Sequence, residues 1–114
     1  MIKKKICFDI DGVICKTRKS NYKSSKPIKE TIKFINELYK KNYIIIFTSR
    51  YMGRTNSNSA KAKKLGYKTT FNQLKSWGLN FDSLIMGKPR FDVYVDDKNL
   101  GFKLNWADYI NKKY

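Results

Sequence analysis

Carboxylates follow two apolar segments of this 114-residue chain. Asp9 and Asp11 end the run ICFDID, and Asp96 and Asp97 follow FDVYV near the other end. A buried charge costs free energy unless an opposite charge or hydrogen bonds compensate it. Four carboxylates gathered in one place need a cation, and oxygen donors in a chain without histidine favour Mg²⁺. The acids therefore predict a magnesium site, provided that the fold brings the two pairs together.

Hydroxyl and cationic side chains follow two other apolar segments. Thr48, Ser49 and Arg50 come directly after YIIIF, and Lys88 follows SLIMG. Carboxylate, metal, lysine and hydroxyl together can stabilise the charge that develops in phosphoryl transfer. The pattern therefore indicates a phosphoryl-transfer site.

Several other chemistries are excluded by composition. A chain without histidine has no Ser-His-Asp triad, no histidine phosphatase centre and no zinc site built on imidazole. Neither Cys7 nor Cys15 has an arginine six positions later, so the phosphate loop of cysteine phosphatases is absent. We expect both cysteines to be core thiols rather than a disulfide.

Apolar runs and helical spacings alternate along the chain, which predicts a parallel sheet with helices on both faces. Pro27 is placed to open the first helix, and Thr70 with Gln73 reads as a capping box for the third. Gly66 and Gly78 are placed as helix ends, and Trp106, Tyr109 and Ile110 as the inner face of the last helix. The expected strands are residues 5–10, 43–47, 83–86 and 91–95, the expected helices are 27–41, 58–65, 70–78 and 105–112, and residues 12–25 are a loop.

The sequence predicts one α/β domain over residues 1–114, because no linker or internal repeat divides it. In parallel sheets ligands bind beyond the carboxyl ends of the strands. The aspartate pairs, Thr48 and Lys88 all follow expected strands, so we expect them to meet there.

These motifs resemble the haloacid dehalogenase-like phosphohydrolases over nearly the whole chain. The four family motifs correspond to FDIDGV, IIIFTSR, GKP and VYVDD, in that order. Among small members, GKPRFDVYVDDK with FTSRYMGR is most similar to capless phosphatases of capsule or surface-polysaccharide biosynthesis. The resemblance implies a three-layer, Rossmann-like core without a cap domain.

The resemblance also implies roles for individual residues. Asp9 would be the nucleophile that forms an aspartyl-phosphate, and Asp11 the general acid and then base. Thr48 would bind a phosphoryl oxygen and Lys88 would steady Asp9 and the phosphoryl charge. Mg²⁺ would be held by Asp9, by the Asp11 main-chain carbonyl, and by the last pair, with Asp97 favoured over Asp96 as the direct ligand.

Substrate contacts are less constrained by the motifs. Ser49, Arg50 and Arg54 are candidate substrate-binding residues, with a surface salt bridge as the alternative for Arg50 and a solvated side chain for Arg54. Relatives often carry a further acid after the last pair, where this chain has Asn99. A site without a cap is open, which suits a bulky substrate or a lid supplied by a second copy in a homo-oligomer.

The net charge of +16 leaves two substrate classes open. We expect a phosphorylated sugar or similar metabolite; the alternative is a nucleic-acid end, which a basic surface would attract. A receiver domain is disfavoured because its phosphoacceptor ends a middle strand, where this chain has Thr48. A silent binding module would need a broken motif, and none is broken. Without a signal peptide or bilayer-spanning run, we expect a soluble cytoplasmic protein without a membrane partner.

Overall fold

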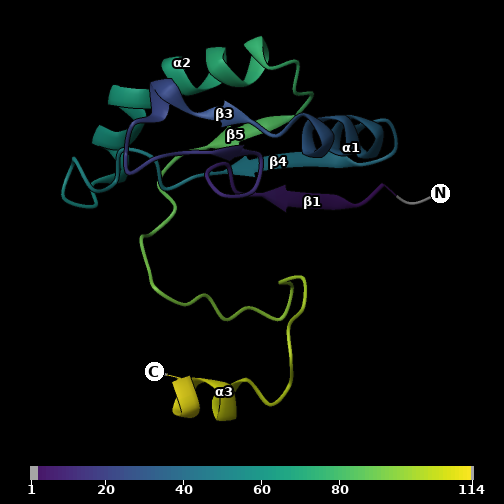
Figure 1. Ribbon diagram of the computed structural model, residues 1–114, viewed down its shortest axis with the longest axis vertical. Coiled ribbons are helices and arrows are strands. Elements are labelled where there is room, and N and C mark those ends of the chain that lie inside the picture. The colour runs from purple at the N-terminus through teal and green to yellow at the C-terminus, as the bar shows by residue number, and fades with distance from the viewer. Residues whose placement is uncertain (1–2, 114) are drawn as a thin grey trace.

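The computed structural model describes residues 3–113, which form an α/β body and a projecting C-terminal arm (Figure 1). The body holds a three-stranded parallel sheet, so the expected α/β class with parallel strands is confirmed. In chain order the elements are β1 (Lys5–Phe8), β2 (Cys15–Lys16), the 3-10 helix η1 (Tyr22–Ser24), β3 (Lys26–Pro27), α1 (Lys29–Tyr39), β4 (Tyr43–Phe47), α2 (Ser59–Ser76), β5 (Ser83–Ile85) and α3 (Trp106–Lys113).

The strand order β1-β4-β5 places β1 at one edge of the sheet. Phe8 pairs with Ile46, and Ile46 with Leu84, so these side chains share one face. Ile44, Ile46 and Leu84 are buried on that face. The opposite face carries the alternate residues Tyr43, Ile45 and Phe47 of β4, Cys7 of β1 and Ile85 of β5.

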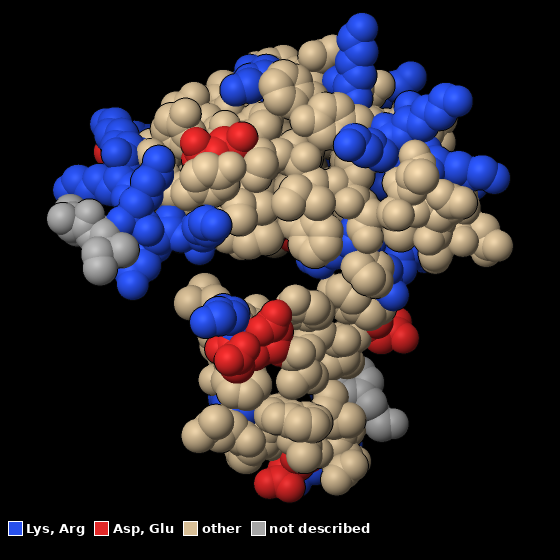
Figure 2. Space-filling model, turned by 180° about the vertical axis from the view of Figure 1, so that it is seen from behind, with Lys and Arg blue, Asp and Glu red and all other residues tan. Residues whose placement is uncertain are grey.

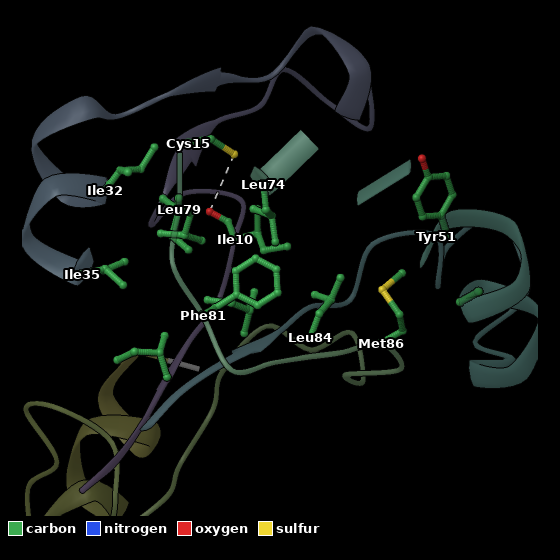
Figure 3. Packing of buried hydrophobic residues seen from close by; sticks show 14 of the residues in the cluster. Ile10, Cys15, Ile32, Ile35, Tyr51, Leu74, Leu79, Phe81, Leu84 and Met86 are labelled. Atoms are coloured by element: carbon green, nitrogen blue, oxygen red, sulfur yellow. Dashed lines mark hydrogen bonds between the residues drawn. The ribbon is translucent and has the colours of Figure 1, made fainter. Parts of the chain in front are cut away.

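Both long helices cover the same face of the sheet (Figure 1). Ile32 and Ile35 of α1, together with Ala62 and Leu74 of α2, pack into one buried cluster with the β4 residues Ile44 and Ile46. Figure 3 shows members of this cluster converging from the helices and the sheet. Each fully buried aliphatic side chain contributes roughly 1.5–3 kcal/mol to the burial free energy. The cluster therefore fixes both helices on one face of the sheet.

The expected loop 12–25 is partly ordered into a flap, and α1 starts later than predicted. Pro27 pairs with Cys15 in the short antiparallel ladder of β2 and β3 instead of opening the helix. The amide of Ile28 donates to the carbonyl of Ile14 at 2.8 Å, and the helix begins at Lys29. The extended backbone that this ladder requires delays the helix by two residues.

The two helices expected at 58–65 and 70–78 are one helix, α2. Gly66 does not end it; a Cβ there would lie 2.1 Å from the Tyr51 ring, so glycine permits close packing. Thr70 is buried within the helix, and among residues 3–113 its hydroxyl has no hydrogen-bond partner, so the capping-box prediction is wrong. Asn58 caps the helix instead by accepting from the Lys61 amide at 3.0 Å.

The fourth expected strand, residues 91–95, is irregular here, and the last helix does not pack inward. Residues 91–113 form the arm, and α3 contains no buried residue. Trp106 and Tyr109, expected to face a core, are 46% and 51% exposed. Among residues 3–113 no helix packs on the second sheet face, so the expectation of helices on both faces is wrong for the described part of one chain (Figure 1).

The arm makes the radius of gyration larger than that of a compact chain of the same length. The radius of gyration is 15.2 Å, whereas a compact chain of this length has about 13 Å. Figure 2 shows the arm as a separate lobe divided from the body by a gap. Within residues 3–113, no helix is both long enough and apolar enough to cross a membrane.

Candidate active site

A tight turn after β1 positions Asp9 and Asp11. The carbonyl of Ile10 accepts from the amides of Val13, Ile14 and Cys15, and Gly12 adopts a positive φ of 87°. Figure 3 shows the thiol of Cys15 directed at the same carbonyl. Glycine adopts this conformation without strain. The turn holds the backbone between the two aspartates in one conformation.

The Asp9 side chain, which follows β1, lies beside the side chain of Lys88, which follows β5. The Asp9 Oδ2 to Lys88 Nζ distance is 3.6 Å, and the two side chains are 32% and 18% exposed. Asp9 Oδ1 accepts from the Ile10 amide at 2.8 Å. The Lys88 amide donates to the Thr48 carbonyl at 3.1 Å, which ties the loop after β5 to the end of β4. Asp9 is thus half-exposed, oriented and next to a cation.

An open cavity of about 220 Å³ adjoins this pair. Its wall consists of Asp9, Ser49, Lys88, Pro89, Arg90 and Phe91. A small anionic group entering there meets the Asp9 carboxylate and the Lys88 ammonium together. Sequence reasoning missed Arg90, although its place two residues after Lys88 was a usable signal.

Asp11 forms an ion pair with Arg50 and does not line the cavity beside Asp9. Arg50 Nη2 lies 2.9 Å from Asp11 Oδ1, Arg50 Nε lies 3.0 Å from Asp11 Oδ2, and the Thr17 hydroxyl donates to the same carboxylate. Burial acts to raise the pKa of Asp11, but the hydrogen bonds from Arg50 and Thr17 and the positive charge of Arg50 outweigh it and lower the pKa. Asp11 is therefore ionised at neutral pH in this conformation.

Arg50 is buried and pairs with Asp11, so the alternative of a surface salt bridge is wrong, while it also lines an open cavity of about 390 Å³. It is only 2% exposed, and its Nη1 donates to Gln73 Oε1 at 2.6 Å. Its guanidinium also lies 4.8 Å from the centre of the Tyr22 ring. These contacts assign Arg50 to orienting Asp11 and joining the flap to α2.

Thr48 is fully buried at the end of β4. Its Oγ1 accepts from the Arg50 amide at 3.1 Å. The hydroxyl therefore helps to shape the turn that follows β4, and the structure shows no opening from it to solvent.

Ser49 and Arg54 line a second, adjoining cavity of about 300 Å³. Arg54 stacks against the rings of Tyr22 and Tyr51, at 5.1 and 4.9 Å from their centres, and donates to the Ser20 carbonyl. Arg90 completes the wall. Two guanidinium groups therefore line this second cavity, and guanidinium groups bind carboxylates and phosphates through paired hydrogen bonds.

The second acidic pair lies on the arm and does not join the first. Asp96 accepts from the Lys98 amide at 2.9 Å and from the Tyr94 hydroxyl at 2.8 Å, and these bonds lower the pKa of Asp96. The Asn99 amide donates to the Asp96 carbonyl in a turn. Within residues 3–113, no cluster of three or more acidic or cysteine side chains could hold a metal ion. The expected four-carboxylate magnesium site is therefore not assembled by one chain in this conformation.

The comparisons with known proteins give a fold and no activity. No protein-family model and no curated protein matches this sequence. A crystal structure from Vibrio cholerae, determined as a structural-genomics target, is similar with a TM-score of 0.78 and 22% sequence identity. The alignment covers 96% of this chain and 98% of that chain. The arm comprises 23 of the 114 residues, so an alignment of that coverage includes most of it, and the two chains share their fold.

Proposed function

We propose that this protein is a Mg²⁺-dependent phosphomonoesterase of the haloacid dehalogenase-like type, with a Rossmann-like core and no cap. The observation that carries the proposal is the Asp9 carboxylate, half-exposed at a strand end and 3.6 Å from the Lys88 ammonium, at the wall of an open cavity. A nucleophilic carboxylate needs access to phosphorus, and the phosphoryl oxygens need a nearby cation.

The reaction would proceed in two displacements at phosphorus. An Asp9 oxygen forms a bond to phosphorus while the ester P–O bond breaks, and the leaving oxygen takes a proton. Water then attacks the aspartyl-phosphate, releasing inorganic phosphate and restoring Asp9. Lys88 offsets the negative charge in both steps.

Asp11 suits the second displacement better than the first. A general acid must carry a proton at the start, but the pairing with Arg50 lowers the pKa of Asp11. An ionised Asp11 can accept a proton from the attacking water. For the first step, the contact with Arg50 has to loosen so that Asp11 can be protonated.

The substrate we favour is a phosphorylated sugar or related metabolite. Ser49 and Arg90 lie in the walls of both cavities, so Arg90 presents a cation beside Asp9, and Arg54 adds a second cation in the adjoining cavity. Small polar cavities of this kind fit a phosphate with a hydroxyl-rich group attached.

Hydrolysis of an aryl phosphate by the purified protein tests the proposal. With Mg²⁺ we expect turnover, and chelation of the metal should abolish it. Asp9→Asn should reduce turnover by about a thousandfold or more while the protein stays folded. The control is Glu37→Gln on exposed α1, which should leave the rate unchanged. Full activity of Asp9→Asn would refute the nucleophile assignment.

A nucleic-acid end is the second candidate substrate, favoured by the charge distribution. Residues 1–90 carry 21 of the 25 basic side chains and five of the nine acidic ones, so they hold the whole +16 charge. Nucleic-acid binding should weaken steeply as salt rises, because bound counterions are released. A flat salt response of KM for a 3′- or 5′-phosphorylated oligonucleotide would favour the metabolite.

A further inference from the structure

The free edge of β1 is an unusual feature of this body. In the described part of the chain β1 pairs with β4 on one side and with no strand on the other, and none of its four residues is buried. Exposed strand edges invite pairing with another strand, and native proteins ordinarily cover or block them. The edge lies next to Asp9, so a strand added there would extend the candidate active site.

The sheet face opposite α1 and α2 is apolar and uncovered. Ile45 and Phe47 are half-buried, Ile85 is 46% exposed, and Cys7, expected in the core, is exposed. Their position on one face follows from the strand register. An apolar sheet face is normally packed against another layer.

Most apolar side chains of the arm are exposed. The Phe91 and Tyr94 rings, 5.0 Å apart, stack on each other, and the Lys88 ammonium lies 5.5 and 5.9 Å from their centres. Leu100 and Leu104 are 99% and 92% exposed, and Phe91, Tyr94 and Val95 are each more than 40% exposed. An eight-residue helix such as α3 is marginal in water without packing. The arm therefore offers one strand-forming segment, residues 91–95, and one amphipathic helix, α3, which are the pieces that the body lacks.

Strand direction decides whether the arm can dock on its own body. To bring Asp96 and Asp97 to Asp9, residues 91–95 must run parallel to β1. Only residues 86–90 separate β5 from that segment, whereas a parallel connection needs about a dozen residues or more. An antiparallel strand would place Asp96 at the opposite end of the sheet.

The distances lead to the same conclusion. The free side of β1 lies three strand spacings from β5, about 14 Å, and a parallel strand must also begin at the far end of the sheet. The six peptide units from Ile85 to Phe91 reach at most about 21 Å when fully extended. Nearly all of that reach would be used, leaving no residues for two reversals of direction. Pro89 moreover disfavours a helical conformation at Lys88, which is unfavourable for a helical crossover through that residue.

A second copy of the chain avoids this constraint. We propose that two copies exchange arms, so that residues 91–113 of each copy cover the β1 edge and the open sheet face of the other and place Asp96 and Asp97 beside the partner's Asp9. The metal role of these acids rests on the proposed function; the exchange itself does not.

Charge and size fit this occupant. The arm carries four of the nine acids and four lysines, so it is neutral, and it can approach a body of charge +16 without the repulsion that a second body would meet. Figure 2 shows acidic side chains on the arm near the gap. Specific interfaces engage about 20–30 residues on each side, and the arm supplies 23. Reciprocal exchange gives a closed two-fold dimer.

The first test is the mass of the full-length protein in solution. Sedimentation should give a dimer of about twice the chain mass of 13.5 kDa at micromolar concentration. Insertion of about twelve Gly and Ser residues after Arg90 should let each arm fold back on its own body and convert the dimer into a monomer. The same insertion after Asn56, in the loop before α2, is the control and should leave a dimer. A monomeric parent protein, or a dimer unaffected by the Arg90 insertion, would overturn the exchange.

The second test separates exchange from other dimers. Asp9→Asn lacks the nucleophile, and the Asp96→Asn, Asp97→Asn double variant lacks the arm carboxylates. Each alone should be inactive. After the two are unfolded together and refolded, mixed dimers contain one site with Asp9 and an intact arm, so about a quarter of the parent activity should return. A mixture that stays inactive, when each variant is dimeric and the parent is active, would show that arms act within their own chain.

The two proposals can fail separately. If the parent protein hydrolyses no phosphate ester but is a dimer that the Arg90 insertion dissociates, the exchange stands and the phosphatase proposal fails. If the parent is an active monomer, the phosphatase proposal stands and the exchange fails.

Discussion

At the scale of single residues, the two aspartates of the first motif have different environments. Asp9 faces an open cavity beside a lysine, whereas Asp11 is enclosed by an arginine, a hydroxyl and a thiol. Residues two apart on a continuing strand would point to the same side, but the turn built on the Ile10 carbonyl ends the strand and sends one side chain outward and the other under the flap. A spacing of two in sequence thus produces two chemically distinct carboxylates.

Lys88 should matter for the rate much more than for folding. Lys88→Met keeps the length of the side chain but removes the charge 3.6 Å from Asp9. We expect kcat for an aryl phosphate to fall by about 10²–10³, as for other groups that stabilise developing charge. Lys98→Met on the arm is the charge-matched control. A kcat within twofold of the parent would contradict the role.

Arg50 should matter for stability. Arg50→Met removes the partner of a carboxylate whose side chain is 27% exposed. Breaking a buried pair costs about 3–5 kcal/mol, and this exposure places the expected loss near the lower end. The control is Lys40→Met, which breaks the exposed pair with Glu37 and should cost less than about 0.5 kcal/mol. Equal losses in urea unfolding would show that the Arg50 pair is not buried in solution.

The same pair predicts a dependence of stability on acid. The folded-state pKa of Asp11 is lowered from 3.8. The stabilisation is therefore complete above the unfolded value and is lost as the pH falls through the folded value. The free energy of unfolding of the parent minus that of Asp11→Asn should be constant from about pH 7 to pH 5 and should shrink below about pH 4. A difference that does not change down to about pH 2 would exclude the effect.

At the scale of elements, the periodicity of apolar residues predicted two of the three strands correctly, but it did not predict contacts between residues distant in sequence. The strands at 43–47 and 83–85 and the end of α2 before Gly78 agree with apolar runs and glycine placement. Gly66 resembled a helix end only because sequence alone cannot show the Tyr51 ring that packs on it. Thr70 and Gln73 had capping-box spacing, but Gln73 instead contacts Arg50 and Tyr22 across the body. Such long-range contacts leave no local signal.

Gly66 provides a direct test of how α2 packs. Alanine would improve helix propensity by about 1 kcal/mol, but its Cβ would overlap the Tyr51 ring at 2.1 Å. Overpacking of this kind costs about 1–3 kcal/mol, so we expect net destabilisation on thermal unfolding. Lys64→Ala, exposed in the same helix, should change stability by less than about 0.5 kcal/mol. The loss should shrink in a Tyr51→Ala background; an unchanged loss there would locate the strain elsewhere.

At the scale of the whole molecule, the sequence predicted a strand and a helix in the arm, but not whether they pack on their own body or on that of a second copy. Residues 91–95 have the composition of a strand, and Trp106 and Tyr109 the spacing of a packed helix, yet all of them except the half-buried Val93 are exposed in one chain. The apolar pattern of a segment indicates that it packs against other residues, but it does not indicate which residues these are. The connection of five residues, 86–90, was the informative feature, because a connection this short is too short to join two parallel strands of one sheet. That limit separates Asp96 and Asp97 from the Asp9 of their own chain.

Arm exchange predicts that thermal stability depends on protein concentration. If folding and association are coupled, a hundredfold increase in concentration favours the folded dimer by about 2.7 kcal/mol, or roughly half that per chain. For a chain of this size, Tm should rise by about 5 °C. The variant with the Arg90 insertion folds its arm on its own body, so its Tm should be independent of concentration. A parent Tm that stays constant over the same range would mean that the arms contribute nothing to the stability of the partner, and the uncovered β1 edge would then require another explanation.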